Sequence, residues 1–251
     1  MTFSFKKLIG FLSINFWLDL LFPVYCLGCQ QERQKKDKNK PGQGFVCAHC
    51  FSTLRFNGLV NIKPPLNQVK NMDLALAAGN YDDFLLAEII KTMKFKTIAA
   101  LGEILADWLI IYWQGQDLLL SQKLIIKNNQ GNQAIKPQIL VVPIPISKKR
   151  RRQRGFNQAE IIAQHFSTAF NYNLTTKLIK IKNTPAQFKL SAKKRLNNLN
   201  NVFSWQGENL TDKTIILIDD VITTGATMCE AGKTLRLAGA KKIIALAVAS
   251  G

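Results

Sequence analysis

Two adjacent carboxylates, Asp219 and Asp220, lie in the stretch of the sequence with the clearest chemical pattern. Residues 215–218 before them are all apolar, three of them isoleucine, which predicts a buried parallel strand that stops at the acidic pair. A short Thr/Gly segment then opens a helix whose apolar residues recur at helical spacing up to Ala238. Residues 243–249 predict a second buried strand, so we expect a right-handed βαβ unit.

This order of elements predicts a sugar-phosphate site. Ligands of open parallel sheets bind outside the carboxyl ends of the strands, where Asp219 and Asp220 lie. Carboxylates beside a phosphate need a ligand that offers donors or a cation, and sugar hydroxyls with Mg²⁺ supply both. Backbone N–H groups at the start of the helix would cradle the phosphate; they belong to Thr223, Thr224, Gly225, Ala226 and Thr227. The alternative is an ordinary strand–turn–helix with Asp and Thr as turn and cap residues.

Four cysteines form two pairs with the spacing of a metal-binding module. Cys26-Leu-Gly-Cys29 and Cys47-Ala-His-Cys50 enclose residues 30–46, which is typical of a four-thiolate zinc site built from two knuckles. Disulfides are the alternative, although no secretion signal indicates an oxidising compartment. Because four thiolates leave no open coordination position, we expect the zinc to be structural.

Positive charge dominates the composition. The chain has 34 Lys and Arg against 16 Asp and Glu, a formal net charge of +18. This excess predicts attraction to nucleic acid, a phosphorylated substrate or an anionic membrane surface. It is densest at residues 148–154, where every side chain except Gln153 is cationic. Arginine forks match phosphate oxygens, so Arg150 and Arg154 favour a pyrophosphate or a nucleic-acid backbone; a solvated basic turn is the alternative.

Other segments position these groups. Helical spacing predicts helices over 84–95, 101–112 and 159–170, and the apolar run 139–142 predicts a strand that ends at Pro143. Lys94 lies on the polar side of the first helix, where a solvated helix face is the alternative. The polar residues 121–137 predict a surface insertion.

The N-terminus superficially resembles a signal peptide. An apolar run at 8–22 follows Lys6 and Lys7, but Asp19 interrupts it and no small-residue cleavage site precedes Cys26. The run is too short and too polar to span a bilayer. We therefore expect an amphipathic helix within residues 1–25, no membrane span and a cytoplasmic protein.

Taken in order, these motifs resemble the ComF family of competence-associated proteins. Residues 216–228 are similar to the ribose-5-phosphate loop of phosphoribosyltransferases, which bind phosphoribosyl pyrophosphate (PRPP). The resemblance covers nearly the full chain and includes the two cysteine pairs, Tyr81 with Lys94, 142–145 followed by Arg154-Gly-Phe-Asn-Gln158, Gln187 with Arg195 and Asn198, and the acidic loop.

The resemblance implies a type I phosphoribosyltransferase-like parallel sheet flanked by helices over 72–251, with a four-cysteine zinc ribbon at 26–55. It implies that Asp219 and Asp220 hold the ribose 2′- and 3′-hydroxyls while residues 223–227 wrap the 5′-phosphate. Further PRPP contacts, with Mg²⁺, would come from Lys94, Arg150 and Arg154. The implied role is natural transformation: handling incoming single-stranded DNA near the uptake channel and its helicase, with membrane association only through that machinery.

Three functions remain open on the sequence. The first is a DNA-uptake protein that binds PRPP or a related ribose phosphate. The second is a phosphoribosyltransferase that acts on an unidentified base or amine, so the sequence leaves open whether the protein is an enzyme. The third is a zinc-ribbon interaction module whose phosphoribosyltransferase fold is only a scaffold.

Overall fold

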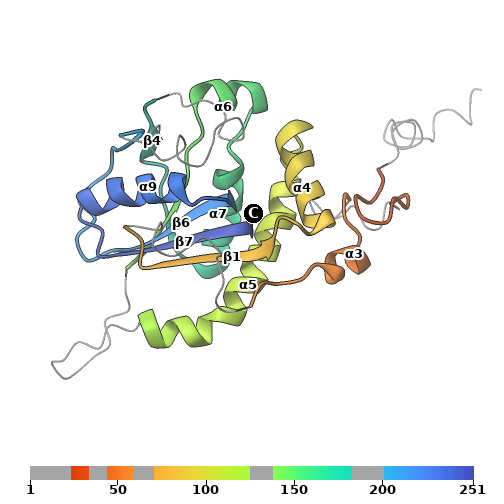
Figure 1. Cartoon of the computed structure of the whole chain (residues 1–251), viewed down its shortest axis with the longest axis horizontal. Helices are drawn as coiled ribbons and strands as arrows, with labels where there is room; N and C mark the ends of the chain where they lie inside the picture. The colour runs from red at the N-terminus through yellow and green to blue at the C-terminus, as the bar shows by residue number, and fades with distance from the viewer. Residues whose placement is uncertain (1–23, 34–43, 59–70, 125–137, 183–200) are drawn as a thin grey trace, which may run out of the picture. The chain divides into compact units, whose positions relative to one another are not determined.

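The computed structural model describes residues 24–33, 44–58, 71–124, 138–182 and 201–251 (Figure 1). The chain divides into two compact units, one up to Thr53 and the other from Leu54 to the C-terminus. Three expectations lie outside the described residues: nearly all of the N-terminal helix, the insertion beyond residue 124, and the motif of Gln187, Arg195 and Asn198.

The first unit is small and irregular where it is described. A bridge pairs Tyr25 with Glu32 in antiparallel fashion, which closes the turn that carries Cys26 and Cys29. The second cysteine pair leads into the short helix α3 (Ala48–Thr53), in which Cys50 is buried.

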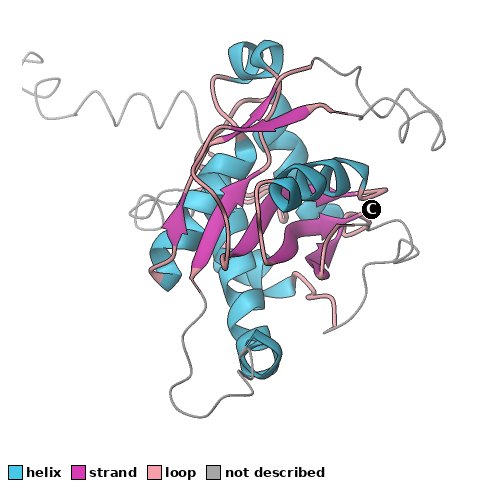
Figure 2. Ribbon diagram, turned by 90° about the vertical axis from the view of Figure 1, so that its left-hand side faces the viewer, coloured by secondary structure: helices cyan, strands magenta, loops and turns pink. Residues whose placement is uncertain are grey.

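The second unit is built on a parallel sheet of five strands in the order β1-β7-β6-β2-β3 (Figure 2). Its central strands are continuous apolar runs, as expected for strands covered on both faces. A separate antiparallel ribbon is formed by β4 and β5. The bounds are β1 Leu74–Asn80, β2 Ile139–Pro143, β3 Asn173–Leu174, β4 Leu178–Lys180, β5 Phe203–Trp205, β6 Thr214–Ile222 and β7 Lys242–Ser250.

Helices cover both faces of this sheet (Figure 1). One face carries α9 together with the β4–β5 ribbon, and their apolar side chains form one cluster with Ile215, Leu217 and Ala245 of the sheet. The other helices include α4, α5 and α7, which pack together at Gly102 of α5. A Cβ at Gly102 would lie 2.6 Å from side-chain atoms of Met93 on α4 and of Ile161 on α7. The bounds are α4 Phe84–Phe95, α5 Leu101–Leu124, α6 Lys148–Arg154, α7 Gln158–Phe170 and α9 Ala226–Leu237.

The expected βαβ unit is present, with one correction at its first strand. β6 does not stop at the acidic pair but continues through it to Ile222. The reason is that β7 extends equally far, pairing Asp219 with Ala247 and Ile222 with Ser250. On the other side β2 ends at Pro143, which is opposite Ile218, so the acidic residues have a strand neighbour on one side only.

Two further differences concern helix length and type. The basic residues 148–154 form helix α6 rather than a turn, since Ser147 caps its first N–H groups and Gly155, at φ 78°, ends it. Helix α5 continues to Leu124 instead of ending near residue 112, and so includes the first four residues of the expected insertion. Among the described helices, none is both long and apolar enough to cross a membrane.

We expect Asp73 to hold the start of β1 against β7. Its carboxylate accepts a hydrogen bond from the backbone N–H of Ile243 at 2.6 Å and pairs with the guanidinium of Arg236. Asp73→Ala should lower the free energy of unfolding by roughly 1–3 kcal/mol, because a backbone donor and a charge lose their acceptor. In the same urea titrations, Asp212→Asn should change stability by less than about 0.5 kcal/mol, since its pairing with Lys241 at 3.5 Å is exposed and asparagine tolerates the left-handed backbone there, at φ 64°. Equal effects would contradict this assignment.

Candidate functional site

The acidic pair lies at the carboxyl-end edge of the sheet, where β6 has already passed the end of β2. Successive residues of a strand point to opposite faces. Asp219 therefore shares a face with Ile215 and Leu217, beneath the β4–β5 ribbon, and Asp220 points to the opposite face. Asp219 also accepts a hydrogen bond from the backbone N–H of Asp220 at 2.8 Å. The two carboxylates thus occupy both sides of one sheet edge.

Lys94 neutralises Asp220. Its Nζ lies 2.8 Å from Asp220 Oδ1, and both side chains are largely withdrawn from solvent. Lys94 is in the last turn of α4, a helix whose start is fixed by the Asp83 side chain accepting from the N–H of Leu86. The solvated-face alternative is therefore wrong for this lysine, which reaches the candidate site expected for it.

Lys180 is a second cation near Asp219, although no ion pair joins these two described residues, and it was not singled out in the sequence. It is the last residue of β4, paired with Phe203 of β5, and its Nζ lies 5.8 Å from the centre of the Phe203 ring. Burial lowers the pKa of Lys180, the charge of Arg150 lowers it further, and Asp219 opposes both. A lone lysine in a three-residue strand has no sequence pattern that reveals this position.

The pKa of Asp219 is raised to about 7. Withdrawal from water is the main cause, and the neighbouring charge of Asp220 adds to it. Lys94, Lys180 and the N–H of Asp220 act in the opposite direction but do not cancel the increase. A carboxyl held in this state gains most from a ligand that brings a cation or hydroxyl donors.

The basic helix α6 contributes Arg150 and Arg154 to this region. Burial lowers the pKa of Arg154, which Asp220 raises and Arg150 lowers. Arg154 donates to the side chain of the buried Gln158 at 3.1 Å, so its guanidinium is held in place. Arg151 instead pairs with Glu160 at 2.7 Å. The structure therefore divides the basic run, because only part of it is directed toward the acidic pair.

The loop after β6 has the geometry expected of an anion cradle. Gly225 has φ 71°, a left-handed conformation that favours glycine, and is the N-cap of α9. Thr224 Oγ1 lies 3.5 Å from the N–H of Ala226. Within the described residues the N–H groups of Thr223, Thr224 and Gly225 donate no hydrogen bond, as is usual before a helix. These donors are available to a phosphate.

The four cysteines of the first unit lie together as expected. Their sulfur atoms are all within 4.8 Å of one another, and Cys29 Sγ is 3.9 Å from Cys47 Sγ. Tetrahedral coordination with zinc–sulfur bonds of about 2.3 Å would place the sulfurs roughly 3.8 Å apart. No disulfide joins them. The cluster can hold a metal ion, and these thiol ligands suit zinc.

The electrostatics of the cluster also favour a cation. Burial raises the pKa of Cys26, but backbone N–H groups of Cys29, Cys47 and Gly28 lower it more, to about 6. Burial and the neighbouring thiols raise the pKa of Cys50 to about 12. Four adjacent thiols therefore cannot all ionise unless a positive ion lies among them.

We expect Asp219→Asn to increase stability at pH 8. The pKa of this carboxyl is higher in the folded than in the unfolded protein, so the unfolded state gives up its proton more readily. The carboxyl therefore lowers the stability of the folded protein by an amount that grows as pH rises from about 4 to about 7. The gain at pH 8 should be on the order of 1 kcal/mol and should vanish near pH 4. Thermal unfolding of both proteins from pH 4 to pH 8 measures it. A variant that is destabilised equally at every pH would refute the electrostatic account.

The chain resembles known proteins over most of its length. Residues 140–251 match the family described as "Phosphoribosyl transferase domain". "Competence protein F" of Haemophilus influenzae is 29% identical over 221 residues, which is 87% of this chain and 86% of that protein.

Two other relatives match over shorter stretches. "Competence protein ComFC" of Bacillus subtilis is 37% identical over 38% of each chain. "DNA utilization protein YhgH" of Escherichia coli K12 is 30% identical over 41% of this chain and 45% of that protein. Together with the parallel sheet and the clustered cysteines, these likenesses show that the chain carries a phosphoribosyltransferase-fold domain and is similar to the ComF proteins over most of its length.

Proposed function

We propose that the carboxyl-end site binds PRPP or a related ribose phosphate together with Mg²⁺. One observation carries this proposal: the acidic pair, with Lys94 bound to Asp220 and the charges of Lys94 and Lys180 acting on Asp219, leads directly into a loop with available N–H donors. A ribose diol would donate to the carboxylates, and the 5′-phosphate would bind in the loop from Thr223 to Thr227. The family match over 140–251 supports this class of ligand.

The cations around the acidic pair suit the pyrophosphate part of the ligand. Arg150 and Arg154 supply guanidinium groups that match phosphate oxygens. Lys94, which pairs with Asp220, can bind a ligand phosphate instead while its ammonium group stays in the site. Mg²⁺ would bridge oxygens of the ligand and reduce its charge. If the protein transfers phosphoribose, these groups would stabilise the charge that develops on the departing pyrophosphate.

Catalysis is a separate step in this proposal. A transferase must also bind an acceptor base or amine, and pyrophosphate release that depends on such an acceptor would identify it. Binding of PRPP without release would favour a protein in which the ligand acts as a signal or a structural partner. A domain that served only as a scaffold would neither bind PRPP nor release pyrophosphate.

The protein is further proposed to handle single-stranded DNA in the cytoplasm during competence, with the uptake machinery and its helicase as partners. The names of the relatives, "Competence protein F" and "DNA utilization protein", support this role. The net charge of +18 supports contact with a polyanion. The cysteine cluster is proposed to hold one structural zinc ion through Cys26, Cys29, Cys47 and Cys50.

Calorimetric titration of PRPP with Mg²⁺ tests the sugar-phosphate site. Wild type should bind with a dissociation constant in the ~1 µM to ~1 mM range of ordinary substrates. Asp219→Asn/Asp220→Asn should bind at least about tenfold more weakly, since two charged acceptors are lost. Binding to wild type should also weaken below pH 7 as Asp219 takes up a proton.

The matched control is Asp107→Asn/Asp212→Asn, which removes the same charge at exposed positions. It should bind PRPP as wild type does. If neither wild type nor the control binds, the site is a relic of the fold, and the DNA role would have to depend on other surfaces.

Metal analysis tests the zinc site. The purified protein should contain about one zinc per chain, released when a mercurial reagent titrates the thiols. Cys47→Ser should lose most of this zinc, whereas Cys229→Ser, outside the cluster, should retain it. A stoichiometry unchanged in Cys47→Ser would exclude the cluster as the binding site.

A further inference from the structure

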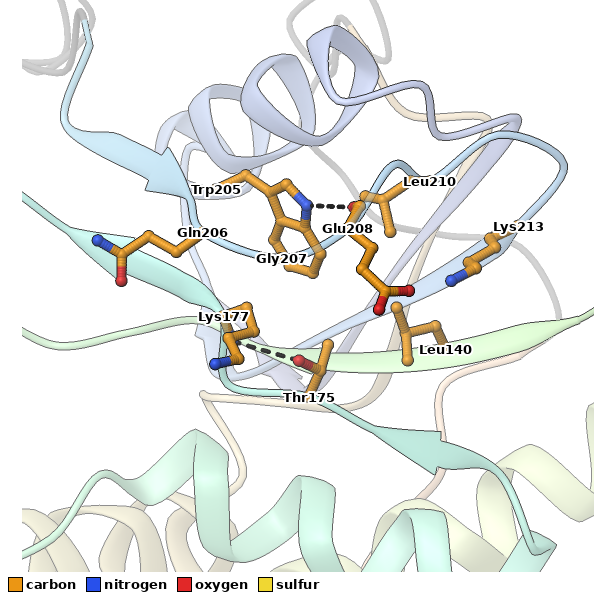
Figure 3. Close-up of a pocket in the computed structure, with 9 residues that line it drawn as sticks. All are labelled: Leu140, Thr175, Lys177, Trp205, Gln206, Gly207, Glu208, Leu210 and Lys213. Carbon is orange, nitrogen blue, oxygen red and sulfur yellow. Dashed lines mark hydrogen bonds between the residues drawn. The ribbon is translucent and has the colours of Figure 1, made fainter.

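Trp205 lines two adjacent hollows on the surface of the second unit. The first measures about 590 Å³ and is also lined by Lys177, Glu208 and Lys213 (Figure 3). The second measures about 410 Å³ and includes Lys233. One aromatic side chain thus forms a wall shared by two cavities, each with lysine at its border.

These hollows are distinct from the sugar-phosphate site. In the β4–β5 ribbon, Trp205 pairs with Leu178 at one end, whereas Lys180, beside Asp219, pairs with Phe203 at the other. The first hollow also contains Leu140, which lies opposite Ile215. From Ile215 to Asp219 is four residues of extended strand, or roughly 13 Å. The ribbon therefore connects two sites at different ends of the sheet.

The indole of Trp205 is fixed rather than loosely packed. Its Nε1 donates to the carbonyl of Glu208 at 2.8 Å. Gly207 lies directly against the ring, since a Cβ at that position would come within 2.4 Å of the indole. Figure 3 shows the ring projecting between Gly207 and the far wall formed by Leu140 and Thr175.

Backbone hydrogen bonds also hold the rest of the wall. The N–H of Gln206 donates to the carbonyl of Lys177 at 2.9 Å, and the N–H of Leu210 donates to Ala238 at 2.9 Å. Lys213 is tied to the start of β7 because its carbonyl accepts from Lys241 at 3.1 Å. The first hollow therefore exists before any ligand binds, which lowers the entropic cost of binding.

The charged groups of this hollow are not paired with one another. In the part of the chain that the structure describes, no ion pair joins Glu208 to Lys177 or to Lys213. The lysines lie at opposite sides of the hollow, and the Glu208 carboxylate points between them (Figure 3). An aromatic wall with two flanking cations suits a nucleobase and its phosphates, and a carboxylate can accept from an N–H group on the edge of a base, such as the N3–H of thymine.

We propose that these hollows bind single-stranded DNA, with one base against Trp205 and the neighbouring phosphates on Lys177 and Lys213. The next nucleotide would lie in the second hollow, near Lys233. Because both hollows share the Trp205 wall, a chain of nucleotides fits them better than a free mononucleotide. The choice of single-stranded DNA as the ligand rests on the proposed DNA-handling function. The site itself does not depend on PRPP binding.

Fluorescence anisotropy of a labelled oligo(dT), measured with the full-length protein at two salt concentrations, tests this proposal. Lys177→Gln/Lys213→Gln should weaken binding at least about fivefold and reduce its salt dependence. The matched control Lys91→Gln/Lys96→Gln removes equal charge from exposed positions on and next to α4 and should bind nearly as wild type does. Equal weakening in both double variants would mean that only the net charge of the protein matters, and it would overturn the proposal.

Trp205→Leu tests the stacking wall and should weaken binding about tenfold. Its thermal unfolding is measured alongside, and the lysine variant keeps the proposal testable if this variant does not fold. A third variant, Lys148→Gln/Lys149→Gln on α6, addresses the other basic surface. Loss of binding in that variant alone would place the DNA on α6 and overturn the assignment to Trp205.

Two further measurements separate this site from its alternatives. Free dTMP should not displace the oligonucleotide at comparable concentration; efficient displacement would make a mononucleotide the ligand. PRPP titrations on the Trp205 and lysine variants should match wild type. If wild type binds oligo(dT) through Trp205 but not PRPP, the sugar-phosphate proposal fails and the DNA site stands. If wild type does not bind oligo(dT), the DNA site fails whatever PRPP does.

Discussion

The second unit depends on a constraint at one strand: two adjacent carboxylates must remain at the edge of a buried sheet. Neither can be removed from water without a counter-charge. Lys94 on α4 meets most of this need, because it pairs with Asp220 and also offsets the charge of Asp219, to which Lys180 of the ribbon contributes less. The compensation is incomplete for Asp219, whose pKa remains raised. The site therefore keeps a capacity for cations and hydroxyl donors that the folded protein alone does not satisfy.

Unequal strand lengths create the space for this site. β6 and β7 run past the acidic pair to Ile222 and Ser250, while β2 stops at a proline opposite Ile218. The last hydrogen bond on that side runs from the N–H of Ile144 to the carbonyl of Ile218 at 2.8 Å, and beyond it β6 has no strand neighbour there. Asn157 then holds the turn after β2 through a hydrogen bond to the carbonyl of Ile144 at 3.0 Å. The opening thus has the end of β2 on one side and the longer strand β6 on the other.

The β4–β5 ribbon links the two proposed sites. It is only three residues long in each strand, yet it carries Lys180 at the end near the acidic pair and Trp205 at the end near the hollows. The two sites are therefore joined by paired strands but occupy opposite ends of them. The four-cysteine unit is a separate case, because its clustered thiols need a positive ion rather than a large apolar core.

The sequence by itself determined the features that depend on local order along the chain. The apolar run before Asp219, the glycine that starts α9 and the spacing of Cys26, Cys29, Cys47 and Cys50 each specify a local geometry, so the fold class and the cysteine cluster were predictable. Tertiary structure alone decided what comes together from distant segments. It extended β6 through the acidic pair because β7 was there to pair with it, directed Lys94 inward and turned Arg151 away to Glu160. It also placed Lys180 and Trp205, for which the sequence has no pattern, since an isolated lysine or tryptophan acquires its neighbours only when the sheet assembles.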